Sequence, residues 1–529
     1  MQRGSRAEVA QPAPNRLTTG QSIRAGGSPL RNYLKNALLM LVSVALCTAV
    51  AEGIARWMEV TDDADVAKNL DQIPLAAGVQ RAWYFDDPPP LPNRGKAPPE
   101  WYELVRRVEE SGHTEGTRRA DMFKAWNSVF VGEPCSHCYL RDAPGHLFVY
   151  DPPDGSPHPR YRFMPNATLP NGLVTNAYGF RGPPVPFVRT PKTVRIAFVG
   201  ASTTIAAHHF PASYPEYVGH WLNVWAASKR LDLRFEILNA GRESIGSPDI
   251  EAIVREEVAP MRPDLVVYYE GANQFDLRTV APSVPRPDAC ARPATAPAPN
   301  PRTRWLDEAA KHLTLARRLR TLIAATDTPA GVPGDGGEWP KPAYDLVWPA
   351  GVDERDPDIG RPDLPVNLST ILGDLDRIRA TTEAAGGELA LASFVWLVKD
   401  GMVLNPIRHR PILEYLNQGY APFRYRDLER LAAFENRVFA KYAAAHHLAF
   451  LDVAKLMPRD PDLFVDAIHT TQSGVRLKAW VAFQELLPLV ERKLASGAWP
   501  KADPGAGMPS VHPAFAPREL DFTCKAPRA

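Results

Sequence analysis

The feature of this sequence that most constrains its fold is a series of short apolar runs separated by helical patterns. Continuous apolar runs of this length are typical of strands buried on both faces of a sheet. The segments between them carry apolar residues at helical spacing, as at Tyr217, Trp221 and Trp225. Strands that alternate with helices form a parallel sheet covered on both sides, so the pattern predicts a flavodoxin-like three-layer α/β/α fold with a five-stranded parallel sheet. The expected strands are 194–199, 235–238, 265–269, 389–395 and 448–453, and further helices are expected over 428–442 and 477–487.

The rest of the chain divides around this α/β domain. Proline makes up 54 of the 529 residues, about twice the usual ~5 %, and its runs favour stiff connections between folded pieces. We expect a basic cytoplasmic segment at 1–32 and a transmembrane anchor at 33–58. An accessory proline-rich region with a helix near 99–108 follows at 59–175, and an extended tail ends the chain at 501–529. The α/β domain lies at 176–500, with an insertion at about 278–360 that carries a basic helix around 305–323.

An uncharged apolar stretch near the N-terminus predicts a membrane span. Residues 37–51 contain no charged side chain, and apolar character resumes at Ile54 and Trp57, which approaches the ~17–25 residues that a span needs. Basic residues dominate before the stretch and acidic residues follow it, so the positive-inside rule predicts a single-pass protein of the inner or plasma membrane with its main domain on the periplasmic or extracellular side. A cleaved signal peptide is the alternative, because Ala49-Val50-Ala51 matches a small-residue cleavage site.

Charge and cysteine content bound the possible ligands. The chain has 61 basic and 60 acidic residues and a formal net charge of +1, which argues against a dedicated nucleic-acid binder. Cys135, Cys138, Cys290 and Cys524 follow the predicted span and could pair in three ways in an oxidising compartment. Cys135 and Cys138 with His137 could also form half of a zinc site, but a second ligand pair with suitable spacing is missing. We therefore expect no metal and no organic cofactor.

Residues suited to acyl-transfer chemistry follow the predicted strands at four places. Because the carboxyl ends of parallel strands meet at one edge of a sheet, these residues are expected to lie together. They are Ser202 after the first strand, Gly241 after the second, Asn273 after the third, and Asp466 with His469 between the fifth strand and the last helix.

Each of these residues can supply one part of acyl-transfer chemistry. Ser202 is a candidate nucleophile, and His469 is a candidate general base whose imidazole Asp466 would hold from the same side of a helical turn. The Ser202 N–H, the Gly241 N–H and the Asn273 amide are candidate oxyanion donors. Taken singly, each residue has an ordinary alternative: a helix cap for the serine and asparagine, a turn for the glycine, and a solvated loop for the histidine.

The ordered set of blocks resembles that of the SGNH hydrolases, also called the GDSL-like family, over about residues 176–495. Asn176-Ala-Tyr-Gly-Phe-Arg-Gly182 is similar to a lead-in found in membrane-anchored members. The resemblance implies a triad of Ser202, Asp466 and His469. The first block departs from the family by reading Gly-Ala-Ser-Thr and the third by reading Gly-Ala-Asn-Gln, which puts the subfamily in doubt. The sequence lacks Gly-x-Ser-x-Gly at the serine, which argues against an α/β-hydrolase.

These observations predict an exported serine esterase that forms an acyl-enzyme and acts on O-acyl, above all O-acetyl, groups of a cell-envelope or extracellular glycan. The expected partners are an acylated carbohydrate or small ester, the membrane through the N-terminal helix, and polysaccharide-biosynthesis proteins, with no nucleic acid. The alternatives are an O-acetyltransferase that uses the same triad and a non-catalytic glycan-binding or scaffold protein. Two nearby pairs are open to interpretation: His208 and His209 could line the pocket or be ordinary loop residues, while Arg242 and Glu243 could recognise substrate or pair with each other at the surface.

Overall fold

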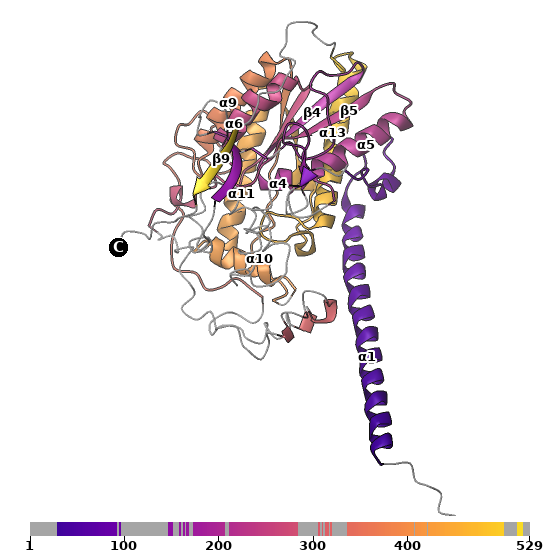
Figure 1. Cartoon of the computed structure of the whole chain (residues 1–529). Coiled ribbons are helices and arrows are strands. Elements are labelled where there is room, and N and C mark those ends of the chain that lie inside the picture. The colour runs from indigo at the N-terminus through magenta and orange to yellow at the C-terminus, as the bar shows by residue number, and fades with distance from the viewer. Residues whose placement is uncertain are drawn as a thin grey trace, which may run out of the picture. The chain divides into compact units, whose positions relative to one another are not determined.

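The computed structural model describes most of the α/β region and parts of the remaining chain (Figure 1). The predicted helix near 99–108, the four cysteines beyond the N-terminal helix, His208 and His209 lie outside the described residues, as does most of the insertion. The described residues are 29–91, 173–206, 211–283 and 336–501 apart from 407 and 421, together with 95–96, 146–151, 516–521 and scattered positions within 158–168 and 305–319.

The chain divides into two compact units, Met1–Trp57 and Met58–Ala529. Helix α1 (Pro29–Asp65) contains the apolar stretch predicted from the sequence. Its segment Tyr33–Arg56 is 24 residues long with a mean hydropathy of 2.1, and none of its apolar window is buried. That length and composition suit a membrane anchor or a signal sequence.

A five-stranded parallel sheet forms the centre of the second unit, which confirms the predicted fold class. The strands run in the order β5-β4-β6-β7-β8, so the first strand lies between the second and the third, as in flavodoxin-like folds. Every residue of β4 and β6 is buried, which explains why both read as unbroken apolar runs. The strands are β4 (Thr193–Gly200), β5 (Arg234–Asn239), β6 (Leu265–Tyr269), β7 (Glu388–Ala392) and β8 (Ala449–Leu451).

Two of these strands end earlier than the apolar pattern predicts. Strand β7 ends at Ala392. The Ser393 N–H still donates to the Leu451 carbonyl of β8 at 2.9 Å, but the Phe394 N–H donates to the Asn436 side chain at 2.7 Å and leaves the ladder. Strand β8 ends at Leu451, and Val453 already begins the short helix α12 (Val453–Leu456). Burial continues past both ends, so hydropathy alone cannot locate them.

Helices cover both faces of the sheet (Figure 1). On one face α5 packs against α13, and the rings of Trp221 and Trp480 meet edge to face at 4.9 Å. On the other face α9 packs against α6, α11 and β7. These helices are α5 (Tyr214–Ser228), α6 (Ser247–Ile253), α9 (Leu368–Ala384), α11 (Tyr425–Ala445) and α13 (Gln472–Ala495).

Short elements complete the described chain. Strand β2 pairs antiparallel with β9 of the C-terminal tail, and β1 pairs with β3, so the accessory region contains strands that the sequence pattern did not reveal. The strands are β1 (Gly95–Lys96), β2 (His146–Asp151), β3 (Ala167–Thr168) and β9 (Ala516–Asp521); the helical turns are η1 (Val66–Gln72), η2 (Arg81–Phe85), α4 (Ser202–Ile205), η4 (Val254–Val258), η5 (Ala259–Met261), η6 (Leu277–Thr279), α10 (Arg410–Glu414), η7 (Tyr415–Gly419) and η8 (Pro461–Leu463).

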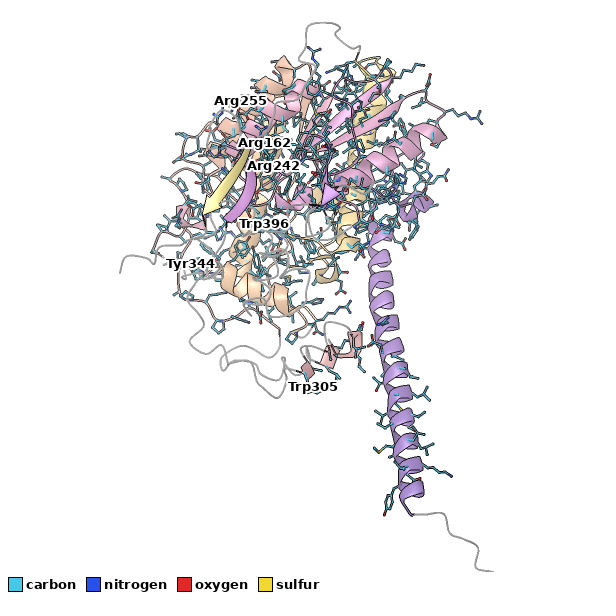
Figure 2. All side chains as sticks on the ribbon, in the orientation of Figure 1. Arg162, Arg242, Arg255, Trp305, Tyr344 and Trp396 are labelled. Atoms are coloured by element: carbon cyan, nitrogen blue, oxygen red, sulfur yellow. The ribbon has the colours of Figure 1, made fainter. Side chains whose placement is uncertain are left out.

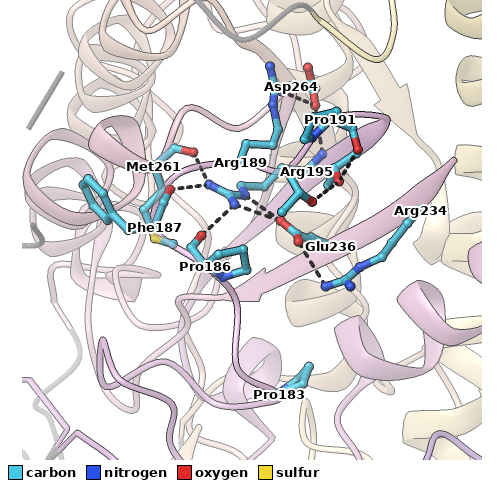
Figure 3. Close-up of polar contacts among 12 residues, drawn as sticks. Pro183, Pro186, Phe187, Arg189, Pro191, Arg195, Arg234, Glu236, Met261 and Asp264 are labelled. Carbon is cyan, nitrogen blue, oxygen red and sulfur yellow. Dashed lines mark hydrogen bonds and ion pairs between the residues drawn. The ribbon is translucent and has the colours of Figure 1, made fainter. Parts of the chain in front are cut away.

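Buried ion pairs fix the amino-terminal edge of the sheet (Figure 3). Arg195 is fully buried and its guanidinium donates to Glu236 at 2.8 Å and to the carbonyls of Pro186 and Met261. Arg189 pairs with buried Asp264 at 2.7 Å. Removing one partner of such a pair costs about 3–5 kcal/mol because the other charge stays buried. The Arg195 guanidinium is fully engaged by protein groups at this edge, which lies opposite the carboxyl-terminal edge of the sheet.

Candidate active site

Ser202 begins a single helical turn directly after β4. Gly200 precedes this turn, and a Cβ at Gly200 would lie 2.1 Å from the Tyr269 carbonyl oxygen, so only glycine allows the backbones to approach this closely. The N-cap residue of α4 is Ala201, and no side chain caps this helix. Ser202 is thus not the helix cap that a serine after a strand usually is, and its 4 % exposed side chain is available for another contact.

That contact is His469. The His469 Nε2 lies 2.8 Å from Ser202 Oγ, and its Nδ1 lies 2.7 Å from Asp466 Oδ2. An ionised carboxylate only accepts hydrogen bonds, so the ring proton sits on Nδ1 and Nε2 accepts from the serine hydroxyl. This is the tautomer that a general base requires.

Asp466 and His469 lie in a loop between η8 and α13 and not on a helical turn, which corrects the local geometry expected from their spacing. A bridge between Phe464 and Thr470 closes the loop, and α13 begins only at Gln472. Asp466 Oδ1 accepts the backbone N–H groups of Ile468 and His469 at 2.9 and 2.8 Å. The carboxylate therefore shapes the loop that carries the imidazole as well as holding the ring.

The electrostatics of Asp466 favour its charged form. Burial works to raise the pKa of its carboxyl, but the interaction with His469 and the hydrogen bonds from the loop outweigh burial and hold the pKa below its usual value. Asp466 therefore stays ionised across the neutral range, where it stabilises a positive charge on His469.

Gly241 packs against the serine turn. A Cβ at this position would lie 2.7 Å from the Ile205 nitrogen and 3.0 Å from the Thr204 Cβ. The Gly241 N–H donates to Asn239 Oδ1 at 3.2 Å, and the Asn239 amide donates in turn to the Thr204 carbonyl at 3.2 Å. The structure therefore brings this glycine to the turn, with its N–H on a protein acceptor.

Asn273 lies on the loop after β6 and is exposed. Its side-chain Nδ2 donates to the Ile245 carbonyl at 2.9 Å, and its backbone N–H donates to Glu270 Oε1 at 2.7 Å. An amide nitrogen carries two hydrogens, so the bond to Ile245 fixes the side chain and leaves a second N–H for a ligand.

Glu270 is a site residue that the sequence reasoning missed. It is 2 % exposed, and the N–H groups of Asn273, Ala272, Gly271 and Ala201 stabilise its charge. Burial nevertheless raises the pKa of its carboxyl to about 7. The signal in the sequence was a glutamate placed directly after the apolar run 265–269, at a strand end where a charge is costly unless backbone donors meet it.

Arg181 is a second residue missed, although it lies inside the quoted lead-in motif. Its Nη1 donates to the Ile205 carbonyl at 3.1 Å, and its Nε pairs with Glu216 Oε2 at 3.0 Å. Arg181 therefore satisfies the carbonyl end of α4 and ties the lead-in to the serine turn.

Arg242 and Glu243 do not pair with each other at the surface. Both are buried, and Arg242 pairs instead with Glu257, which also lies 3.4 Å from Arg162 (Figure 2). These buried charges hold the chain behind Gly241 to η4. Among the described residues, no cluster of three or more histidine, cysteine, aspartate or glutamate side chains is arranged to hold a metal ion.

Among known proteins, only solved structures resemble this chain. No family model matches the sequence, and no curated protein matches it. Solved structures that resemble it are the lipase/acylhydrolase from Enterococcus faecalis (14 % identity, TM-score 0.28, 56 % of this chain and 96 % of that chain), a GDSL-like lipase from Bacteroides thetaiotaomicron (12 %, 0.26, 57 % and 88 %) and the acetylxylan esterase Axe2 from Geobacillus stearothermophilus (14 %, 0.30, 56 % and 96 %). At these identities and TM-scores the likenesses carry no argument about activity, which must rest on the side chains themselves.

Proposed function

We propose that this chain is an exported, membrane-anchored serine esterase that acts through an acyl-enzyme. The observation that supports the proposal is the hydrogen-bonded chain from Ser202 Oγ through His469 to Asp466, with distances of 2.8 and 2.7 Å. Ser202 comes from the turn after β4, whereas Asp466 and His469 come from one loop before α13; both segments lie at the carboxyl edge of the sheet, where α/β folds place reactive groups.

The proposed reaction follows from this geometry. Ser202 Oγ attacks an ester carbonyl carbon while His469 Nε2 takes the hydroxyl proton, and Asp466 stabilises the resulting imidazolium. The tetrahedral intermediate collapses as the C–O bond to the alcohol breaks and His469 returns the proton to the leaving oxygen. Water then attacks the acyl-enzyme with the same histidine as base, which releases the acid and restores the serine.

The oxyanion is assigned to the Ser202 N–H, the Gly241 N–H and the Asn273 amide. The close packing of Gly241 on the serine turn supports its part in the group. Because the Gly241 N–H contacts Asn239 at 3.2 Å, a long hydrogen bond, we expect an oxyanion to compete for it.

The proposed substrate is an O-acetyl group on a glycan of the cell envelope or outside the cell. The support is location: a 24-residue apolar helix precedes the domain, and acylated glycans are the esters that an anchored, exported enzyme meets. Transfer to a sugar hydroxyl in place of water uses the same acyl-enzyme.

The test uses the full chain in detergent with an aryl acetate, with and without an oligosaccharide acceptor. We expect ester cleavage by the wild type and a loss of several orders of magnitude in Ser202→Ala, since one triad member carries most of the catalytic unit. Acetylated oligosaccharide in the second arm would identify a transferase. Equal rates for the wild type and Ser202→Ala, or no cleavage by either, would rule out the esterase proposal.

A further inference from the structure

A buried lysine lies directly beneath the serine turn. Lys478 belongs to α13, the helix that follows the His469 loop, and its side chain is 2 % exposed. Its Nζ donates at 2.8 Å to the carbonyl oxygen of Thr203, the residue after Ser202, although the two residues are 275 positions apart in the chain.

The surroundings of the Lys478 ammonium are aromatic and apolar. Nζ lies 4.7 Å from the ring centroid of Tyr214 and 4.9 Å from that of Tyr269, where the ring faces attract a cation. With Phe198 and Val267 from the sheet, these side chains line a small apolar cavity. Burial alone lowers the pKa of the Lys478 ammonium to about 7, with no acidic side chain acting against it.

Stability does not account for this lysine. An unpaired ammonium in an apolar site costs free energy, and a methionine of similar length would fill the space without that cost. A group kept at such a cost beside a nucleophile is a candidate for a functional role.

The hydrogen bond from Lys478 to Thr203 stabilises α4, the short helix that begins with Ser202. Helix α4 has only four residues, so most of its carbonyls have no partner within the helix. The Ser202 carbonyl bonds to the Ala206 N–H at 2.9 Å, and Arg181 takes the Ile205 carbonyl. Lys478 provides the hydrogen bond to the remaining carbonyl, that of Thr203. The orientation of this peptide group affects the orientation of the turn that carries Ser202.

We propose that Lys478 is a positioning residue that fixes the serine turn through the Thr203 carbonyl, so that Ser202 Oγ and its N–H keep their directions during acylation. This inference rests on the proposed function, in which Ser202 is the nucleophile. Lys478 touches no reacting atom; its effect passes through one peptide group. We expect its loss to slow the chemical step and to leave substrate affinity unchanged.

The experiment measures the reaction of Ser202 with a fluorophosphonate probe, which needs no knowledge of the natural substrate. In the full chain, Lys478→Met is expected to lower the second-order labelling rate by about 10–100-fold, the effect of a nucleophile displaced by about an ångström. The KM for an aryl acetate should stay constant while kcat falls. The melting temperature of Lys478→Met should equal or exceed that of the wild type, because the buried charge is gone. If the role of Lys478 were only structural, its replacement would lower the melting temperature.

The matched control is Lys341→Met. Lys341 is also partly buried, donates to the Asn417 carbonyl at 3.4 Å and has a pKa lowered to about 8 by burial, but it lies on another segment. Its variant should label at the wild-type rate. If Lys478→Met does not fold, Lys478→Gln replaces it with the same expected loss, since its shorter side chain withdraws the donor from Thr203.

Two results would overturn the inference: a folded Lys478 variant that labels within twofold of the wild type, or an equal loss in Lys341→Met. Failure of the proposed function looks different, because the wild type itself would then not label at Ser202, or Ser202→Ala would label equally.

Discussion

At the scale of single residues, the candidate site depends on which hydrogen-bond partners each polar group has. Asp466 serves both its own loop and the His469 ring, whereas Asn273 is anchored through one amide hydrogen to Ile245. The same residue types would be unremarkable in other settings. Their partners give them distinct roles, and substitutions that change one partner at a time can separate those roles.

Asp466→Asn tests the orientation of the imidazole. An amide can donate to His469 Nδ1, which favours the tautomer with its proton on Nε2 and removes the base from Ser202; we expect kcat to fall by about 10³–10⁴. Asp460→Asn is the control, because the Asp460 carboxylate also accepts the backbone N–H of the residue two positions later, Asp462, at 3.0 Å. Its ester hydrolysis should match the wild type. Equal activity in both variants would remove Asp466 from the triad.

Asn273→Ala tests the oxyanion assignment. If the second amide hydrogen meets the developing negative charge, acylation should slow by about 10²–10³ with little change in KM. Asn273→Asp should be slower still, because a carboxylate repels the oxyanion. The lost bond to Ile245 should cost about 1 kcal/mol of stability in either case. A near wild-type acylation rate in folded Asn273→Ala would assign this side chain to the loop alone.

At the scale of elements, the site is a set of short turns pressed together at the carboxyl edge of the sheet. The serine turn contacts Gly241 from the loop after β5 and the Tyr269 backbone at the end of β6. Glu270 bridges these turns through the N–H groups of Ala201 and Asn273. The turns are therefore constrained by close backbone approach and by one buried carboxyl.

Gly241→Ala tests the close approach. Its new Cβ would meet the Ile205 nitrogen at 2.7 Å, so α4 must shift; we expect a loss of about 1–3 kcal/mol of stability and slower labelling of Ser202. Gly373→Ala in helix α9 is the matched control, because a Cβ there meets nothing within 4 Å. This substitution should raise the free energy of unfolding by about 0.5–1 kcal/mol. Chemical denaturation measures both, and equal stability changes would contradict the packing argument.

Glu270 predicts a pH dependence of stability. Burial raises the pKa of its carboxyl from 4.5 to about 7, so the native state binds this proton more tightly than the unfolded chain. Its contribution is fully present below about pH 4.5 and is lost as pH rises through about 7. The groups facing it are Tyr268, Tyr269, Tyr420 and Glu435, whose pKa values burial also raises. Relative to Glu270→Gln, the wild type should lose up to about 3 kcal/mol between pH 4.5 and 7; a constant difference in unfolding free energy would contradict the assignment.

At the scale of the whole molecule, the chain joins an apolar N-terminal helix to an α/β unit. We expect the protein to stay in the membrane fraction after a high-salt or alkaline wash and to be released by detergent, with the apolar N-terminal helix still attached. A span of 24 residues with flanking charges of opposite sign is long enough to be retained. A soluble protein whose N-terminus is Glu52 would show a cleaved signal peptide.

The sequence alone determined the sheet and the order of the reactive blocks. Apolar runs such as 194–199 and 265–269 indicate buried strands, because a strand that is buried on both faces needs apolar residues at consecutive positions. Parallel connectivity then places the groups that follow the strands at one edge, so Ser202, Gly241, Asn273, Asp466 and His469 could be named in advance.

Only the tertiary structure decided which groups meet. The contacts of His469 with Ser202 and of Lys478 with Thr203 join residues 267 and 275 positions apart, and no local pattern encodes such pairs. The sequence suggested a helical turn for Asp466 and His469, but backbone hydrogen bonds made it a loop. Whether a glutamate or lysine among apolar neighbours lies buried depends on donors and acceptors that other segments bring. Arg181 and Lys478 were missed because their partners lie on such segments. Glu270 was missed although three of its backbone donors, Gly271, Ala272 and Asn273, follow it directly; only Ala201 comes from another segment.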